Sequence, residues 1–240
     1  ELRRTVEAHL GSSYTLVSYE KIGEKRVRGR IAVAVFARKC DVDEGRVHEV
    51  STNKMLMDVG STGKGASTKG GVSIEVRVGA RTLCFVGAHL PADAGGRAQH
   101  VLRNACAAAL LGGDAFMKLQ ERCHVFFLGD LNYRAVPHDL THTRDSTLKR
   151  VAYASSKPSR VAWAAATRDD ELIQDRRSGR ALCGFREAPL YFAPTCRRVP
   201  GVALPGRGAD AAALCEAYTL FKSNAGAATV GDASALARRK

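Results

Sequence analysis

The stretch "FFLGDLNYR", residues 126–134, carries an apolar, strand-like run directly into an acid, an amide and an arginine. Side chains of an extended segment alternate between its two faces, so Asp130 and Asn132 are predicted to point the same way while Leu131 turns into the interior. Layered α/β proteins place their ligands at such strand ends. A plain turn is the competing interpretation, because Gly, Asp and Asn end many strands that have no catalytic role.

On both sides of this stretch the sequence interleaves helical and strand-like patterns. Helices are predicted at 2–10, 97–121 (interrupted or ended near 112–113) and 169–179. Strands are predicted at 15–22, 30–38, 72–79 and 123–130, with a hairpin over 78–90. The continuously apolar strands, 30–38 and 123–130, are expected to be buried on both faces, and the alternating strand 72–79 on one face. Strands outnumber helices, so the predicted class is α/β or α+β with packed sheets.

The chain has 240 residues, which allows one large domain or two small ones. Residues 188–195 are expected to close the ordered part, and 198–240, rich in Gly, Ala and Pro, to form a long loop or insertion.

The formal charge of +13, from 37 basic and 24 acidic residues, indicates a polyanionic partner: nucleic acid, an acidic membrane surface or a phosphorylated metabolite. The seven cysteines form no CxxC pair, which favours reduced thiols in an intracellular, cytoplasmic protein over a disulfide framework or a structural zinc site. The sequence contains neither an apolar run of about 18 residues nor a signal-peptide pattern.

Several catalytic motifs are excluded by their spacing. "GSTGKG" is no phosphate-binding P-loop, because Gly65 follows Lys64 where Ser or Thr is required. The remaining candidates are Lys69, His89, Asp130, Asn132 and Arg134. Asp130 is suited to activating water, Asn132 and His89 to holding phosphoryl oxygens, and Lys69 or Arg134 to neutralising their charge.

A family resemblance accounts for these residues together. The segments "KGGVSIEV", "CFVGAHLPA", "FFLGDLNYR", "DDELIQDRRSG" and "GFREAPLYFAPTCRR", in this order, resemble the inositol polyphosphate 5-phosphatases of the DNase I-like endonuclease/exonuclease/phosphatase superfamily. The resemblance spans the chain from its first helix to Arg198, and it implies a single, partial catalytic domain over 1–240. It implies two packed mixed β-sheets flanked by helices, a partial DNase I-like four-layer sandwich, and Mg²⁺-assisted attack of water on a 5-phosphate.

The resemblance also assigns roles to single residues. It makes Asp130 the water-activating acid, and Asn132 and His89 contacts of the phosphate or the transition state. Lys69, in "STKGG", and Arg134 are implied to support substrate binding. Thr195 and Arg197 match the family segment that contacts the neighbouring 4-phosphate.

The sequence departs from the family pattern at several points. Cys196 replaces a tyrosine and Thr68 an asparagine. The metal-carrying glutamate, the tryptophan-cysteine-aspartate-arginine motif and the later aspartate-histidine pair have no match, so the metal ligands are unknown and the domain is expected to be incomplete at both ends. We expect the isolated segment to be inactive or barely active, and poorly stable because sheet edges would be exposed.

The sequence thus favours a Mg²⁺-dependent phosphatase acting on phosphoinositide lipids or soluble inositol polyphosphates. Its basic charge also predicts peripheral contact with an anionic membrane surface. A degenerate module that binds phosphoinositides without cleaving them is the alternative, and a nuclease of the same superfamily is less favoured, so no nucleic-acid partner is expected. Oligomeric state and adjoining domains stay open.

Overall fold

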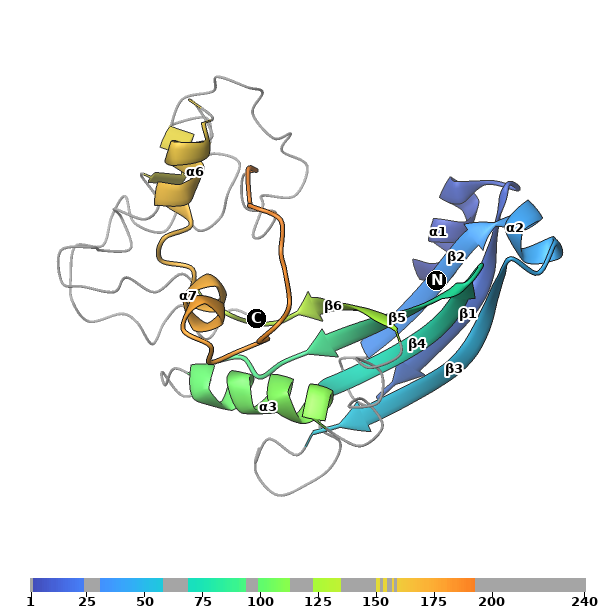
Figure 1. Cartoon of the computed structure of the whole chain (residues 1–240), viewed down its shortest axis with the longest axis horizontal. Helices are drawn as coiled ribbons and strands as arrows, with labels where there is room; N and C mark the ends of the chain where they lie inside the picture. The colour runs from blue at the N-terminus through green and yellow to red at the C-terminus, as the bar shows by residue number, and fades with distance from the viewer. Residues whose placement is uncertain are drawn as a thin grey trace. The chain divides into compact units, whose positions relative to one another are not determined.

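The computed structural model describes residues 2–23, 31–57, 69–93, 99–112, 123–134, 150–151, 153–154, 157 and 159–192. The chain divides into two compact units. The first unit comprises Glu1–Asp93 and Gln99–Asn132, and the second comprises Ala94–Ala98 and Tyr133–Lys240. All the described strands belong to the first unit (Figure 1).

Two sheets form the first unit. The smaller pairs β1 (Tyr14–Ile22) with β2 (Ile31–Arg38), antiparallel, and the larger has the order β3 (Val47–Leu56), β4 (Gly70–Val78), β5 (Arg81–His89), β6 (His124–Asp130). In the larger sheet β3, β4 and β5 are antiparallel neighbours, whereas β5 and β6 are parallel. Parallel neighbours need a crossover connection, and α3 (His100–Gly112) lies in it.

The main core lies between the two sheets. Val72, Ile74 and Val76 of β4 are 0–1% exposed and pack against Ile31 and Val33 of β2. Burial of these aliphatic side chains supplies the principal driving force for stacking one sheet on the other.

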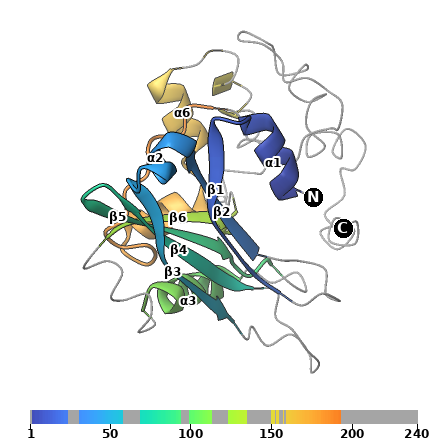
Figure 2. The same cartoon turned by 90° about the vertical axis from the view of Figure 1, so that its right-hand side faces the viewer.

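One helix lies beside each sheet, as Figures 1 and 2 show for α1 (Leu2–Leu10) and α3. The Leu110 side chain of α3 lies against Gly71, on the face of β4 opposite the small sheet. On the other side, the guanidinium carbon of Arg3 in α1 lies 5.8 Å from the centroid of the Tyr19 ring in β1. The predicted α+β class with packed sheets and flanking helices is confirmed.

Several predicted elements occur where the sequence placed them. The predicted helix at 2–10 is α1, and the predicted strand at 15–22 begins one residue earlier as β1. Helix α3 ends at Gly112, the predicted stop. Strand β3 was not expected, because most of its side chains are polar and exposed, and neither were α2 (Lys39–Asp43) and α6 (Arg160–Ala166).

The predicted burial of three strands was wrong. Strand β4, expected to be half-buried, is buried on both faces over Gly70–Val76, and its buried Glu75 accepts a 2.5 Å hydrogen bond from Ser51 Oγ. Strands β2 and β6, expected to be buried on both faces, each expose one. Position in the sheet decides burial here: β4 is central, whereas β2 and β6 are edge strands of the described sheets.

An ion pair links the two sheets at their surface. Lys54 Nζ of β3 lies 2.9 Å from Glu20 Oε1 of β1, and Thr52 Oγ1 donates to Glu20 Oε2 at 3.3 Å. The hydrogen bond from Lys54, and then the backbone N–H of Lys21, lower the pKa of the Glu20 carboxyl from its ordinary value of 4.5.

This lowered pKa predicts a small pH dependence of stability. A depressed folded-state pKa stabilises the fold above the unfolded pKa, and that gain is lost as the pH falls through the folded pKa. Glu20→Gln is therefore expected to lower the free energy of unfolding by less than about 1 kcal/mol at pH 7, because the pair is partly solvent-screened. In urea titrations the difference should shrink as the pH falls below the ordinary value of 4.5 and be lost as the pH falls through the lowered folded-state pKa. Glu49→Gln, at an exposed position of β3, is the control; an equal effect there would contradict the assignment.

The second unit contains α6 and α7 (Glu171–Arg177). Their N-caps are Ser159, whose Oγ accepts the Ala162 N–H at 3.1 Å, and Asp170, whose Oδ1 accepts the Ile173 N–H at 2.9 Å. Burial raises the pKa of the Asp170 carboxyl, although the N-cap hydrogen bonds oppose this effect. The predicted loop or insertion at 198–240 lies outside the described residues. In the part of the chain that the structure describes, no helix is both long and apolar enough to cross a membrane.

Candidate active site

Three candidate residues of the first unit meet at one end of the larger sheet. The register pairs Gly70 with His89 across β4 and β5, and His89 with Asp130 across β5 and β6. Lys69 directly precedes β4. Because β4 runs antiparallel to β5 and β6 runs parallel to it, the start of β4 and the ends of β5 and β6 coincide.

The side chains of these residues are close enough to interact. Lys69 Nζ lies 2.6 Å from His89 Nε2, and His89 Nε2 lies 3.7 Å from Asp130 Oδ2. An ammonium group can only donate, so a hydrogen bond from Lys69 requires His89 Nε2 to be the acceptor, in the tautomer that carries its proton on Nδ1. Nε2 therefore faces a cation at hydrogen-bonding distance and a carboxylate slightly beyond it.

The backbone at position 129, directly before Asp130, requires a glycine. Its φ of +136° is unfavourable for residues with a side chain, and a Cβ there would overlap the backbone carbonyl of Ala88. The backbone of β6 thus passes very close to β5 at the residue before Asp130. That approach sets the position of Asp130 beside His89.

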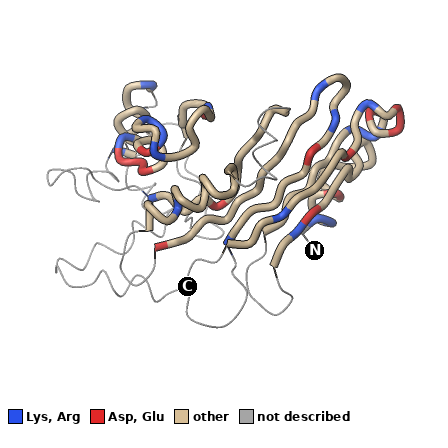
Figure 3. The backbone as a smooth tube through the Cα atoms, turned by 60° about the horizontal axis from the view of Figure 1, so that its bottom comes forward, with Lys and Arg blue, Asp and Glu red and all other residues tan. Residues whose placement is uncertain are grey.

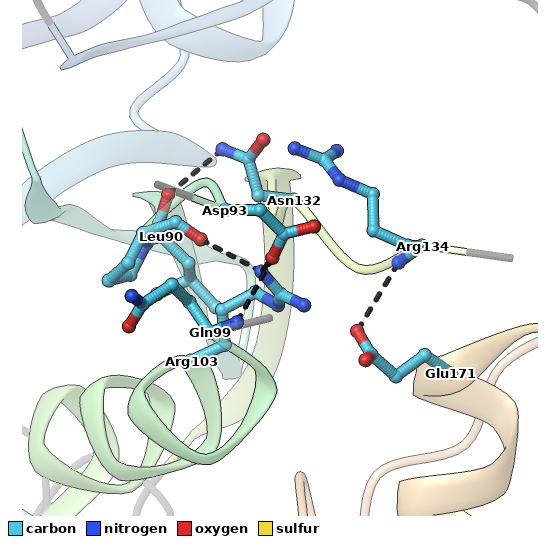
Figure 4. Close-up of polar contacts among 8 residues, drawn as sticks. Leu90, Asp93, Gln99, Arg103, Asn132, Arg134 and Glu171 are labelled. Carbon is cyan, nitrogen blue, oxygen red and sulfur yellow. Dashed lines mark hydrogen bonds and ion pairs between the residues drawn. The ribbon is translucent and has the colours of Figure 1, made fainter. Parts of the chain in front are cut away.

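The predicted arrangement of Asp130 and Asn132 on one extended face was wrong. Strand β6 ends at Asp130, and Asn132 adopts a φ of +57°, a left-handed conformation that asparagine tolerates. Its Nδ2 donates to the Leu90 carbonyl at 2.9 Å (Figure 4). The Leu90 N–H in turn donates to the Asp130 carbonyl at 3.0 Å. One role of Asn132 is therefore to fix the segment that follows His89.

The remaining predicted site residues are not placed in this cluster. Arg134 belongs to the second unit, where its backbone N–H donates to Glu171 Oε2 at 3.3 Å and its carbonyl accepts the Glu171 N–H at 2.9 Å (Figure 4). Its side chain is exposed. Thr195 and Arg197 lie outside the described residues, so their roles stay predictions.

A pocket of about 450 Å³ adjoins His89 and Asp130. Its walls come from three strands of the first unit: 31–34 of β2, 87–89 of β5 and 128–130 of β6. This volume lies within the range that accommodates small ligands. The free face of β6 continues beside it, with Phe126 and Leu128 about half exposed and Phe126 stacked on Phe85 at 5.1 Å between ring centroids.

The described residues do not by themselves make a magnesium site. Magnesium prefers oxygen ligands, commonly one or two carboxylates completed by water and phosphate. Asp130 supplies a carboxylate that is 68% exposed, but no three His, Cys, Asp or Glu side chains gather within the described ranges in a way that could hold a metal. The Lys69 ammonium beside His89 also disfavours a cation at that nitrogen.

Charge is dispersed over the first unit. Figure 3 shows basic and acidic positions interspersed along the described backbone of this unit. Near α2 the charges are paired: Lys39 Nζ lies 2.7 Å from Asp43 Oδ2, and Arg46 Nη2 lies 2.7 Å from Asp41 Oδ1. The net positive charge of the sequence therefore does not by itself locate a binding surface here.

Comparison with known proteins assigns the chain to a family. A model of the endonuclease/exonuclease/phosphatase family 2 matches residues 1–203. The chain belongs to this family. One family relative, type I inositol polyphosphate 5-phosphatase 5 of Arabidopsis thaliana, is 29% identical over 195 residues, which cover 75% of the chain. The chain spans about a third of that relative, 32% of its length. The resemblance to the 5-phosphatases is thereby confirmed.

Solved structures agree on the fold of the family. The inositol polyphosphate 5-phosphatase domain of SPsynaptojanin, in complex with inositol (1,4)-bisphosphate and calcium ion, matches with a TM-score of 0.54 at 18% identity, covering 84% of this chain and 52% of that one. A ferrous NO complex of Cimex nitrophorin matches equally well, with a TM-score of 0.54 at 13% identity over 84% of this chain and 61% of that one. Proteins of different function thus share this fold, so the chemistry must be argued from the site.

Proposed function

We propose that this chain is part of a phosphatase that hydrolyses the 5-phosphate of inositol polyphosphates or phosphoinositide lipids. The observation that carries the proposal is the cluster of Lys69, His89 and Asp130 at one end of the larger sheet. The family to which the chain belongs includes inositol polyphosphate 5-phosphatases. A carboxylate, an imidazole and a cation suit the transfer of a phosphoryl group to water.

The proposed reaction is an in-line displacement. Water attacks phosphorus and its proton passes to the Asp130 carboxylate, while the bond from phosphorus to the inositol oxygen breaks and that oxygen takes up a proton from solvent. Asp130 then releases its proton to solvent. The Lys69 ammonium stabilises negative charge on the phosphoryl oxygens, and His89 contacts them. Asn132 holds the backbone after His89 through Leu90. Arg134, Thr195 and Arg197 are proposed as substrate-binding residues on the strength of the resemblance.

We also propose Mg²⁺ as the cofactor, since the resemblance implies it, with ligands that include residues outside the described set. We propose in addition that the protein is intracellular and touches anionic membrane surfaces. The 240-residue polypeptide assayed by itself is expected to be inactive or barely active, because the family's metal-carrying glutamate matches none of its residues.

The test is phosphate release by the full-length gene product. It would be given an inositol phosphate that carries a 5-phosphate, one that lacks it, and a phosphoinositide lipid in vesicles, each with Mg²⁺ or with EDTA. Release from the 5-phosphate substrates alone, abolished by EDTA, is the expected result. Cleavage of plasmid DNA without phosphate release would establish the nuclease alternative and overturn the proposal.

A binding module is the second candidate. The substitution of Cys196 for a tyrosine in the segment assigned to 4-phosphate contact favours it, as do the family motifs for which the sequence has no match. Saturable binding of the same vesicles by the full-length protein, with no phosphate released at any metal concentration, would establish this function instead.

A further inference from the structure

An arginine lies on the buried face of α3. The buried residues of this helix are Arg103, Cys106, Ala107 and Leu110, spaced as one helical stripe. The Arg103 side chain is 0% exposed. Burying a charged group is costly unless it is paired and hydrogen-bonded, so a buried guanidinium must have strong local partners.

The partners of Arg103 belong to the segment that follows β5. Its Nη1 donates to Asp93 Oδ1 at 2.7 Å (Figure 4). It also donates to the Pro91 carbonyl at 3.3 Å. Asp93 Oδ1 also accepts the Gln99 N–H at 3.0 Å, directly before α3 begins. One ion pair and two further hydrogen bonds thus tie residues 91–93 to the start and the buried face of the helix.

The same segment is held from the opposite side by the end of β6. Leu90 is 0% exposed; its N–H donates to the Asp130 carbonyl and its own carbonyl accepts Asn132 Nδ2. Residues 90–93 are therefore fixed both by α3 and by the strand end that carries Asp130. His89 is the residue immediately before this segment.

We propose that Arg103 is a positioning residue for the site: it holds residues 90–93 in the conformation that sets His89 between Lys69 and Asp130. Its effect on turnover rests on the proposed function, but its effect on His89 does not. Without the guanidinium, the Asp93 carboxylate and the Pro91 carbonyl lose a shared charged donor, and the segment regains conformational freedom. Arginine suits this role because its planar head is always charged and its donors are fixed in direction.

The decisive experiment observes His89 without requiring catalysis. In the 240-residue chain, the Cε1–H NMR signal of His89 would be assigned with His89→Gln and then compared among variants. Arg103→Met is expected to shift or broaden that signal, and Arg103→Lys to restore it in part. Val76→Ala, a core truncation in β4, is the control for lost stability and should leave the signal in place. Where Arg103→Met fails to fold, Asp93→Asn gives the same readout, because it weakens the ion pair but keeps an oxygen for Gln99.

Turnover by the full-length protein gives the second readout. If the proposed function is right, Arg103→Met lowers kcat by about 10- to 100-fold with little change in KM, as expected when a reacting group is displaced rather than a binding contact removed. A wild-type protein that releases no phosphate would refute the proposed function and leave the NMR comparison to decide on Arg103. An unchanged His89 signal in both Arg103→Met and Asp93→Asn would overturn the positioning role.

Discussion

Replacing Asp130 with asparagine is expected to lower kcat of the full-length protein by about 10²- to 10⁴-fold, with KM changed less than about threefold. Asparagine keeps the size and one oxygen of the side chain but cannot accept a proton from water at neutral pH. Proton acceptance matters in the transition state and contributes little to ground-state binding, so the loss should appear in kcat.

The position of Asp130 makes this experiment clean. Its side chain is 68% exposed. The residue ends β6, an edge strand of the described sheet, so the substitution removes little packing. The melting temperature should therefore stay close to that of the wild type. Asp43→Asn is the matched control, because it makes the same charge change in the first unit, where Asp43 pairs with Lys39 on α2. An Asp130→Asn protein with wild-type kcat, or one whose loss lies wholly in KM, would refute the role as water-activating acid.

The local sequence pattern predicted the positions of the helices and strands of the first unit better than it predicted the burial of their side chains. The segment 72–79 alternates apolar with polar residues, yet β4 is buried on both faces because Ser73 and Glu75 lie on the face that α3 covers and Glu75 is hydrogen-bonded by Ser51. The apolar runs in β2 and β6 each leave one face open. Which strand is central depends on pairing between distant segments, and a single strand's composition does not encode that.

The site was predictable to the extent that it depends on strand ends. Lys69, His89 and Asp130 were each selected from the sequence, and the register brings them together. The position of Asn132 was missed, because its left-handed backbone ends the alternation that the prediction assumed. Arg103 was also missed, although a charged residue in the otherwise apolar stripe of α3 was a signal available in the sequence.

Gly129→Ala is expected to be strongly destabilising, lowering the free energy of unfolding by about 2–5 kcal/mol. Two costs add: alanine is strained at a φ of +136°, and its methyl group would overlap the backbone of Ala88, which cannot move without breaking the pairing of β5 with β6. Neither cost can be relieved by rotating a side chain, because the obstructing atoms are main-chain atoms.

Two other glycines of the first unit separate these costs. Gly79, in the turn between β4 and β5, has a φ of +56° but nothing within 4 Å of an added Cβ, so Gly79→Ala should cost about 1–2 kcal/mol from backbone strain alone. Gly112, at the end of α3, has open space and no left-handed φ, so Gly112→Ala should be close to neutral. Urea unfolding of the three variants measures the order directly. The contradicting result is a Gly129→Ala variant that lowers the free energy of unfolding no more than Gly79→Ala does. That result would show that the close contact between β5 and β6 is not the reason for a glycine before Asp130. The placement of Asp130 beside His89 would then need another cause.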